Sequence, residues 1–149
     1  MQVWRISRRE FAAAALSGFG AAQRGGRWNS RGVPVVYTSQ SQSLALLELL
    51  VHADKSQLPE DLVFTSIDVA DGTIVDLDIL PAGWNAIPHG TASQQIGDTW
   101  CARGTSIALR VPSVIVPRES NELLNPLHPD FSKVKSIDII DTAIDLRLF

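Results

Sequence analysis

The chain has 149 residues, a formal net charge of −3, one cysteine and a hydrophobic fraction of 45%. These values fit one ordinary globular domain, residues 1–149, and exclude a disordered chain or an internal disulfide. The acidic balance argues against a broad nucleic-acid-binding face, and no apolar run approaches the ~20 residues that span a bilayer. The single cysteine, Cys101, suits a reducing compartment, so we expect a cytoplasmic protein.

The N-terminal segment has two interpretations. Residues 2–6 alternate as a strand, and residues 8–17 are predicted to follow as a helix capped by Ser7. The stretch "SRREFAAAALSGFGAA" (7–22) also looks like a twin-arginine export signal. We favour the helix, because alanines form helices well and glycines follow them. Residues 18–34 hold five glycines and a proline and predict a long loop of the kind that usually has a function.

The next segment predicts a strand, a helix and two further strands. "PVVYTS" (34–39) is β-branched and typical of a buried strand. Ser41 or Ser43 can cap a helix that runs to about Ala53. Residues 62–69 and 73–79 are predicted to be strands joined by a hairpin turn at Asp71-Gly72.

The last third predicts one helix and several short strands around irregular segments. The helix is predicted to run from Thr91 to about Arg103 after a loop over 81–90. The predicted strands cover 106–111, 113–117, 134–140 and 144–148, and residues 118–131 are predicted to be irregular. Strands dominate with a few helices between them, which indicates a single compact α+β domain.

Glu48 is the unusual residue of the predicted helix. Leu44, Leu47 and Val51 lie at i−4, i−1 and i+3, so Glu48 falls on or beside the face expected to be buried. An unpaired buried carboxylate is costly. Two explanations remain: Glu48 reaches solvent and pairs with His52, or it projects into a polar cavity.

Polar residues shortly before this helix favour the cavity. Arg27 and Asn29 lie in the glycine-rich loop, and Tyr37 ends the strand that follows. Arginines beside Gly25-Gly26 can grip a phosphate, although ordinary surface arginines are the simpler interpretation of the spacing alone. No catalytic triad can be identified, and the scattered histidines have no metal-ligand spacing, so no metal is predicted.

Four segments together resemble a known family. They are "VWRIS" (3–7), "LSGFGAAQRGGRWNSRGVPVVYTSQSQSLALLELLVH" (16–52), "LRVPSVIVPRESNELLNPLHPDF" (109–131) and "DLRLF" (145–149). In this order they span nearly the whole chain and are similar to the RES-domain proteins, the toxin half of RES–Xre toxin–antitoxin modules. The resemblance implies an ADP-ribosyltransferase-like fold, with a split mixed β-sheet core and flanking helices around an NAD cleft. It also makes "SGFGA" part of the domain, which weakens the export interpretation.

The resemblance implies a set of site residues. Arg27, Glu48 and Ser113 match the arginine, glutamate and serine that give the family its name, and Tyr37 matches its tyrosine. These four are the expected catalytic residues. The expected substrate contacts are Arg5, Gly26, Arg27, Asn29, Tyr37 and Asn125, and His128 shares the "NPLHP" segment with Asn125.

The activity implied by the resemblance is degradation of NAD⁺ at its nicotinamide–ribose bond, by hydrolysis or phosphorolysis, which causes growth arrest. NAD⁺ would be a substrate rather than a cofactor, with inorganic phosphate as co-substrate in the second case. One carboxylate can suffice, because nicotinamide is cationic on its ring nitrogen and departs neutral. We expect Glu48 to stabilise the developing positive charge, Arg27 to grip the diphosphate or ribose, Tyr37 to stack on nicotinamide, and Ser113 to contact the ligand or orient Glu48.

The implied partner is an Xre-like helix-turn-helix antitoxin that blocks the cleft, with the toxin as a homodimer in the complex. Two alternatives stay open. The chain could transfer ADP-ribose to a protein, because the same bond breaks first, or it could be a non-catalytic module that only binds a partner. No direct contact with nucleic acid or membrane is expected.

Overall fold

Seven strands form one mixed sheet in the order β4-β5-β6-β2-β1-β3-β7 in the computed structural model, which describes residues 1–149. Only β4 and β5 are parallel; the other neighbours are antiparallel. The strands are β1 (Gln2–Arg8), β2 (Val36–Ser39), β3 (Leu62–Asp68), β4 (Ile74–Asp76), β5 (Ala108–Pro112), β6 (Ser120–Leu124) and β7 (Lys135–Asp141), and the α-helices are α1 (Phe19–Arg24), α2 (Gln42–His52) and α3 (Thr91–Arg103).

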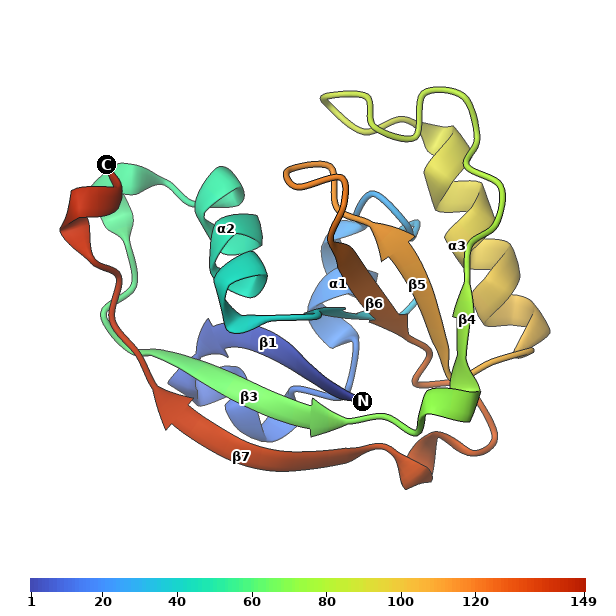
Figure 1. Cartoon of the computed structure of the whole chain (residues 1–149), viewed down its shortest axis with the longest axis horizontal. Coiled ribbons are helices and arrows are strands. Elements are labelled where there is room, and N and C mark those ends of the chain that lie inside the picture. Colours follow the sequence, from blue (N-terminus) through green and yellow to red (C-terminus); the bar gives the residue numbers. More distant parts are fainter.

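The sheet divides between β2 and β1. β1 pairs with β3 along its whole length, but it meets β2 only at Trp4↔Ser39. Figure 1 shows the two halves, with β1, β3 and β7 along the lower edge, β4, β5 and β6 at the right, and α2 standing above β1. The expected α+β fold with a split mixed sheet is therefore confirmed.

Two apolar clusters form the core. One surrounds Val3, Val36 and Leu124, and the other joins Trp28 of the glycine-rich loop to Trp100 of α3. Side chains alternate between the faces of a strand, so Val36 and Tyr37 of β2 point to opposite sides of the sheet. The second cluster, which Tyr37 borders, is where α3 packs on the half of the sheet that contains β5 and β6.

Several predicted elements are confirmed. The helix predicted from Thr91 to Arg103 is α3, with the same bounds. The helix before Ala53 is α2, and Ser41 caps it by accepting a hydrogen bond from the amide of Leu44 at 3.1 Å. The strands predicted at 2–6, 34–39, 62–69 and 134–140 are β1, β2, β3 and β7, with ends shifted by one or two residues.

The predicted Asp71-Gly72 hairpin is wrong. Residues Asp71–Thr73 form a 3-10 turn, and β4 covers only Ile74–Asp76 of the predicted strand 73–79. β1 and β7 occupy both edges of β3, so β4 pairs in parallel with β5 instead. A turn sequence cannot form a hairpin where both edges of the preceding strand are already paired.

Two predictions between 113 and 131 are also wrong. Residues 113–117 are not a strand, because Ser113 Oγ accepts hydrogen bonds from the amides of Ile115 and Val116, both at 3.1 Å, and turns the chain. β6 lies inside the segment predicted to be irregular. Its polar residues weaken the strand pattern, and pairing with both β2 and β5 overrides it.

Three further corrections concern the first 34 residues and the C-terminal segment. The helix predicted at 8–17 is a 3-10 helix at Arg9–Ala14 whose Ala12 is buried, so this segment is built into the fold. The loop predicted at 18–34 contains α1. The strand predicted at 144–148 is a 3-10 turn at Leu146–Leu148.

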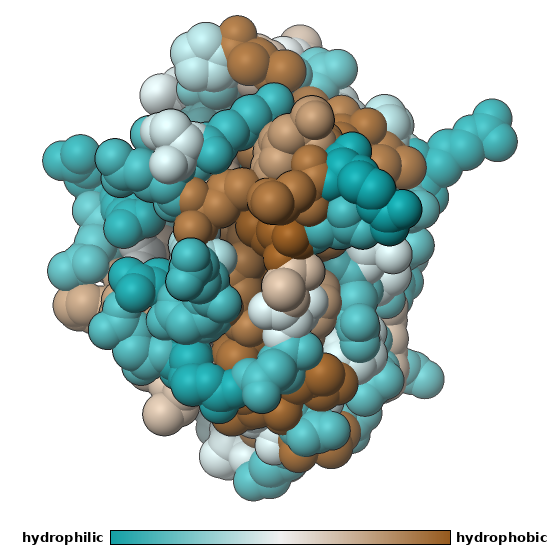
Figure 2. Space-filling view, turned by 90° about the vertical axis from the view of Figure 1, so that its left-hand side faces the viewer, coloured by the Kyte–Doolittle hydropathy of each residue, from teal (hydrophilic) through white to brown (hydrophobic).

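Helix α2 buries a different face from the one expected. Leu44 and Ala45 are buried, whereas Leu47 and Val51 are 37% and 57% exposed. Leu146, Leu148 and Phe149 of the C-terminal segment are also exposed. Figure 2 shows apolar side chains gathered in a hollowed band on this side of the molecule. None of the helices has the length and apolarity needed to cross a membrane.

Candidate functional site

Glu48 is held between α2 and the end of the β5–β6 hairpin. Its Oε1 atom accepts hydrogen bonds from Ser113 Oγ at 2.9 Å and from Asn121 Nδ2 at 2.6 Å. Its Oε2 atom accepts none. The side chain is half-buried, and His52 is not its partner. Glu48 is therefore a fixed carboxylate with one oxygen engaged and the other available.

Ser113 can only donate to Glu48. The residue is fully buried. Its oxygen already accepts from the amides of Ile115 and Val116, and a hydroxyl has two acceptor positions and one proton. The proton therefore points at the carboxylate. Of the two roles expected for Ser113, this contact corresponds to orienting Glu48.

Tyr37 fixes the glycine-rich loop. Its hydroxyl accepts from the amide of Trp28 at 3.0 Å and donates to Asn29 Oδ1 at 2.7 Å. Burial raises the pKa of this hydroxyl well above its usual range, so it stays protonated as a donor. A Cβ on Gly26 would stand 2.7 Å from the Tyr37 hydroxyl oxygen, so only glycine allows this approach.

Asn29 connects the same loop to the preceding segment. It is completely buried, and its Nδ2 donates to the carbonyls of Ala21 at 2.8 Å and Val33 at 2.9 Å. Its Oδ1 receives the Tyr37 proton. All its amide atoms are therefore engaged within the protein, and Asn29 shapes the loop that carries Arg27.

Arg27 reaches across to the loop at 81–90. Its Nη1 donates to the carbonyls of Trp84 at 2.7 Å and Ala86 at 2.9 Å, and the rings of Trp84 and Trp28 stack with centroids 6.4 Å apart. Burial lowers the pKa of Arg27, while the charge of Glu48 partly offsets this. The negative charge of Glu48 therefore favours the charged form of Arg27. The Nε and Nη2 groups of Arg27 have no hydrogen-bond partner in the protein.

Arg5 is a half-buried cation without a carboxylate partner. Its Nη1 donates to the Tyr37 carbonyl at 3.2 Å, and its buried Nε has no hydrogen-bond partner. Burial lowers the pKa of Arg5. A buried donor without a partner is costly, and groups with a perturbed pKa gather at functional sites.

Asn125 and His128 lie apart from this cluster. Asn125 is fully buried and follows Asn121 by four residues, or about 13 Å at the usual strand rise. Its Nδ2 donates to the Cys101 carbonyl at 3.1 Å, and its Oδ1 accepts from the amide of Leu127. His128 Nδ1 accepts from the amide of Asp130. The structure thus gives both residues local packing contacts.

Sequence reasoning missed three residues that support the site. Asn121 lies in the segment predicted to be irregular, where no strand indicated its direction. Gln94 of α3 donates to the carbonyls of Gly26 at 3.0 Å and Asn29 at 3.2 Å. Asp98, one helical turn further along, accepts from the Ser30 amide at 2.8 Å. The i, i+4 spacing of two polar residues on one face of α3 was the signal that could have found this pair.

Glu122 lies on the face of β6 opposite to Asn121. It is fully buried, its Oε1 accepts from Arg110 Nε at 3.2 Å and Ser120 Oγ at 2.8 Å, and its Oε2 has no partner. Burial raises the pKa of Glu122, and the hydrogen bonds from Ser120 and Arg110 only partly oppose it. Glu122 is thus a fully buried carboxylate, separated from the half-buried Glu48 by the sheet.

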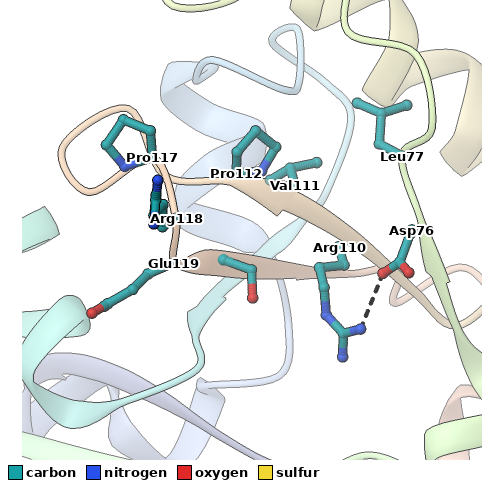
Figure 3. Close-up of a pocket in the computed structure, with 9 residues that line it drawn as sticks. Asp76, Leu77, Arg110, Val111, Pro112, Pro117, Arg118 and Glu119 are labelled. Atoms are coloured by element: carbon teal, nitrogen blue, oxygen red, sulfur yellow. Dashed lines mark hydrogen bonds and ion pairs between the residues drawn. The ribbon is translucent and has the colours of Figure 1, made fainter.

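Two hollows lie elsewhere on the surface. One, of about 230 Å³, is bordered by Asp76 and Arg110, which form an ion pair at 3.0 Å (Figure 3). The other, of about 690 Å³, runs between Val75–Pro81 and α3. Neither is lined by Arg27, Tyr37 or Glu48, so the chemistry of the side chains, rather than the depth of a hollow, identifies the candidate site. No three His, Cys, Asp or Glu side chains gather as a cation site.

Comparison with known proteins gives a consistent result. The family model described as "RES domain" matches residues 2–148. "Toxin Res" of Photorhabdus laumondii subsp. laumondii is 42% identical over 99% of this chain and 97% of that protein. "Prs ADP-ribosylating toxin" of Sphingobium sp. is 40% identical over 97% of this chain and 94% of that protein.

One solved structure shares the fold. It is the toxin–antitoxin complex MbcT–MbcA of M. tuberculosis, with a TM-score of 0.77 and 18% identity. The match covers 95% of this chain and 84% of the other. At this identity the likeness concerns the fold alone.

Proposed function

The chain belongs to the RES-domain family, and on that premise we propose that it is the toxin of a toxin–antitoxin pair and cleaves the nicotinamide–ribose bond of NAD⁺. The observation that carries the proposal is the setting of Glu48. Two donors hold one of its oxygens, and the other oxygen has no hydrogen-bond partner. The negative charge of Glu48 also favours the charged form of Arg27. Loss of NAD⁺ would arrest growth.

One carboxylate is enough for this reaction. Nicotinamide leaves as a neutral molecule, so no second acid has to protonate the leaving group. The ribose becomes positively charged as the bond breaks, and a fixed negative oxygen stabilises that charge. Glu48 Oε2 is the atom proposed for this role, because Ser113 and Asn121 occupy Oε1.

Two cations beside the segment that carries Tyr37 fit the phosphates of the substrate. Arg27 retains its Nε and Nη2 groups, and Arg5 its Nη2 group, as donors without a protein partner, whereas the Nε of Arg5 is buried away from a ligand. Tyr37 can offer its ring to nicotinamide, but its hydroxyl holds the loop. We therefore propose Arg27 and Arg5 as diphosphate or ribose contacts. No cofactor is required, and water or inorganic phosphate would accept the ADP-ribosyl group.

The proposed partner is an antitoxin with an Xre-like helix-turn-helix part, which would block the site while the toxin forms a homodimer. Two comparisons support the antitoxin: a relative is named "Toxin Res", and the protein with the same fold was solved in a toxin–antitoxin complex. Copurification of the chain with a neighbouring small helix-turn-helix protein, and loss of toxicity on coexpression, are the expected results.

Release of free nicotinamide by the purified chain tests the proposed reaction. Glu48→Gln should lower the rate about 10²- to 10³-fold, the usual loss when one stabilising group of a transition state is removed. Glu60→Gln is the matched control, because Glu60 is exposed and its side chain forms no hydrogen bond or ion pair. A folded Glu48→Gln protein with the wild-type rate would overturn the assignment. Products formed with and without phosphate identify the acceptor.

A second candidate function is transfer of ADP-ribose to a protein. The name of the Sphingobium relative, an "ADP-ribosylating toxin", favours it. NAD⁺ labelled in its adenosine part, incubated with the chain and a cell extract, separates the two functions. Label on protein supports transfer, whereas label only in free ADP-ribose or its phosphate supports degradation. If nicotinamide is released neither by the purified chain nor in the presence of the cell extract, a binding module is the remaining function.

A further inference from the structure

Asn121 lies between Glu48 and a second polar side chain of the sheet. Its Nδ2 donates to Glu48 Oε1 at 2.6 Å, the shorter of the two hydrogen bonds to that oxygen. Its Oδ1 accepts from Ser39 Oγ at 2.7 Å. Ser39 and Asn121 are register partners of β2 and β6. The pairing of β2 with β6 therefore fixes the backbone of Asn121, and Ser39 fixes the oxygen of its side-chain amide.

The neighbours of Asn121 also determine which way its amide points. A carboxylate can only accept, so the NH₂ group must face Glu48 and the carbonyl oxygen must face Ser39. Ser39 is buried, and its hydroxyl donates in this arrangement. An aspartate at the same position would place a second carboxylate against Glu48, while a shorter side chain would leave Oε1 with Ser113 alone.

We propose that Asn121, supported by Ser39, is a positioning residue that holds Glu48 Oε1 so that Oε2 faces the substrate. This inference rests on the proposed NAD⁺ cleavage and deepens it. Ser113 approaches from the turn after β5 and Asn121 from β6, so the two donors restrain the carboxylate from different elements. Any rotation of the Glu48 carboxylate away from this position would break the hydrogen bonds from Ser113 and Asn121.

The kinetic test compares Asn121→Ala, Ser39→Ala and Asn121→Asp. Asn121→Ala should lower kcat for nicotinamide release about 10- to 100-fold, the effect of losing one hydrogen bond to a charged group, with KM near the wild-type value. Ser39→Ala should lower kcat less. Asn121→Asp should recover activity relative to wild type as the pH falls, because two adjacent carboxylates share a proton and the protonated aspartate then donates as the amide did.

Gln40→Ala is the matched control. Gln40 Oε1 accepts from the amide of Ser120, one residue before Asn121, at 2.9 Å, and forms no hydrogen bond with Glu48. A merely structural role of Asn121 predicts that kcat falls equally in Asn121→Ala and Gln40→Ala. It also predicts that Asn121→Asp recovers no activity as the pH falls. Either of these results would overturn the proposal.

A readout that needs no activity separates this inference from the proposed function. The carboxyl ¹³C resonance of Glu48, identified by its absence in Glu48→Gln, should move in Asn121→Ala and Ser113→Ala and stay in place in Gln40→Ala. If it moves but wild type releases no nicotinamide, the positioning of Glu48 stands and the proposed reaction fails. If it stays in place in Asn121→Ala, the positioning role is refuted whatever the activity.

Discussion

Gly97 of α3 is the most tightly packed glycine of the chain, and Gly97→Ala tests the packing that holds the candidate site. A Cβ at this position would overlap the carbonyl oxygen of Trp28 and stand 2.7 Å from its carbonyl carbon. Both atoms are backbone and cannot rotate away. Ordinary contact begins at 3.4 Å, so the carbonyl carbon alone requires a separation at least 0.7 Å larger.

The energy of this change combines losses and one gain. Overpacking of this kind costs about 1–3 kcal/mol. Moving α3 away also weakens the two hydrogen bonds from Gln94 to the carbonyls of Gly26 and Asn29, each worth about 1 kcal/mol. Alanine is a better helix former than glycine by about 1 kcal/mol. The free energy of unfolding should therefore fall by about 2–4 kcal/mol, a large part of the usual 5–15 kcal/mol.

Urea unfolding followed by tryptophan fluorescence measures this difference. Trp28 and Trp100 lie in the cluster that α3 closes, so the signal reports the relevant packing. Gly20→Ala is the matched control, because Gly20 also lies in a helix but a Cβ added there would have no atom within 4 Å. It should raise stability by about 0.4–1 kcal/mol. A Gly97→Ala protein as stable as wild type would refute the packing argument.

Two further predictions concern buried titratable groups. Burial raises the pKa of Glu122 in the folded protein, so its ionised form costs stability at neutral pH. As the pH falls through that raised pKa towards the unfolded value of about 4.3, wild type should gain stability relative to Glu122→Gln. Urea unfolding at a series of pH values measures this difference. A stability difference that does not change with pH would contradict the prediction. Burial, with a smaller effect of the Asp98 charge, raises the pKa of the Cys101 thiol to about 12. A thiol reagent should therefore modify Cys101 only in denaturant, and rapid modification of the native protein would show the thiol to be accessible.

Much of the fold was predictable because the signals are local. Ser41 caps α2 through the amide of Leu44, three residues away, and the glycine at 104 ends α3 with a left-handed backbone. β3 is rich in β-branched and apolar residues and is buried except for its last residue. Such features are properties of neighbouring residues and are visible without a tertiary structure.

The candidate site was predictable only in part. Motif resemblance named Arg27, Tyr37, Glu48 and Ser113, and the structure joins Ser113 to Glu48 and connects Tyr37 to the loop that carries Arg27. It does not bring Asn125 to them. A motif indicates which residues a family shares, but it does not distinguish a residue that faces a ligand from one that holds a loop.

The sequence by itself determined the local elements α2, α3 and β3, the α+β class and the resemblance that named Glu48. Only the tertiary structure decided that β4 pairs with β5, that β6 exists, and that Asn121 contacts Glu48 from 73 residues away. The physical reason is that strand pairing depends on which edges remain free after the other strands have paired. A half-buried carboxylate likewise takes its partners from whichever strands the fold brings beside it.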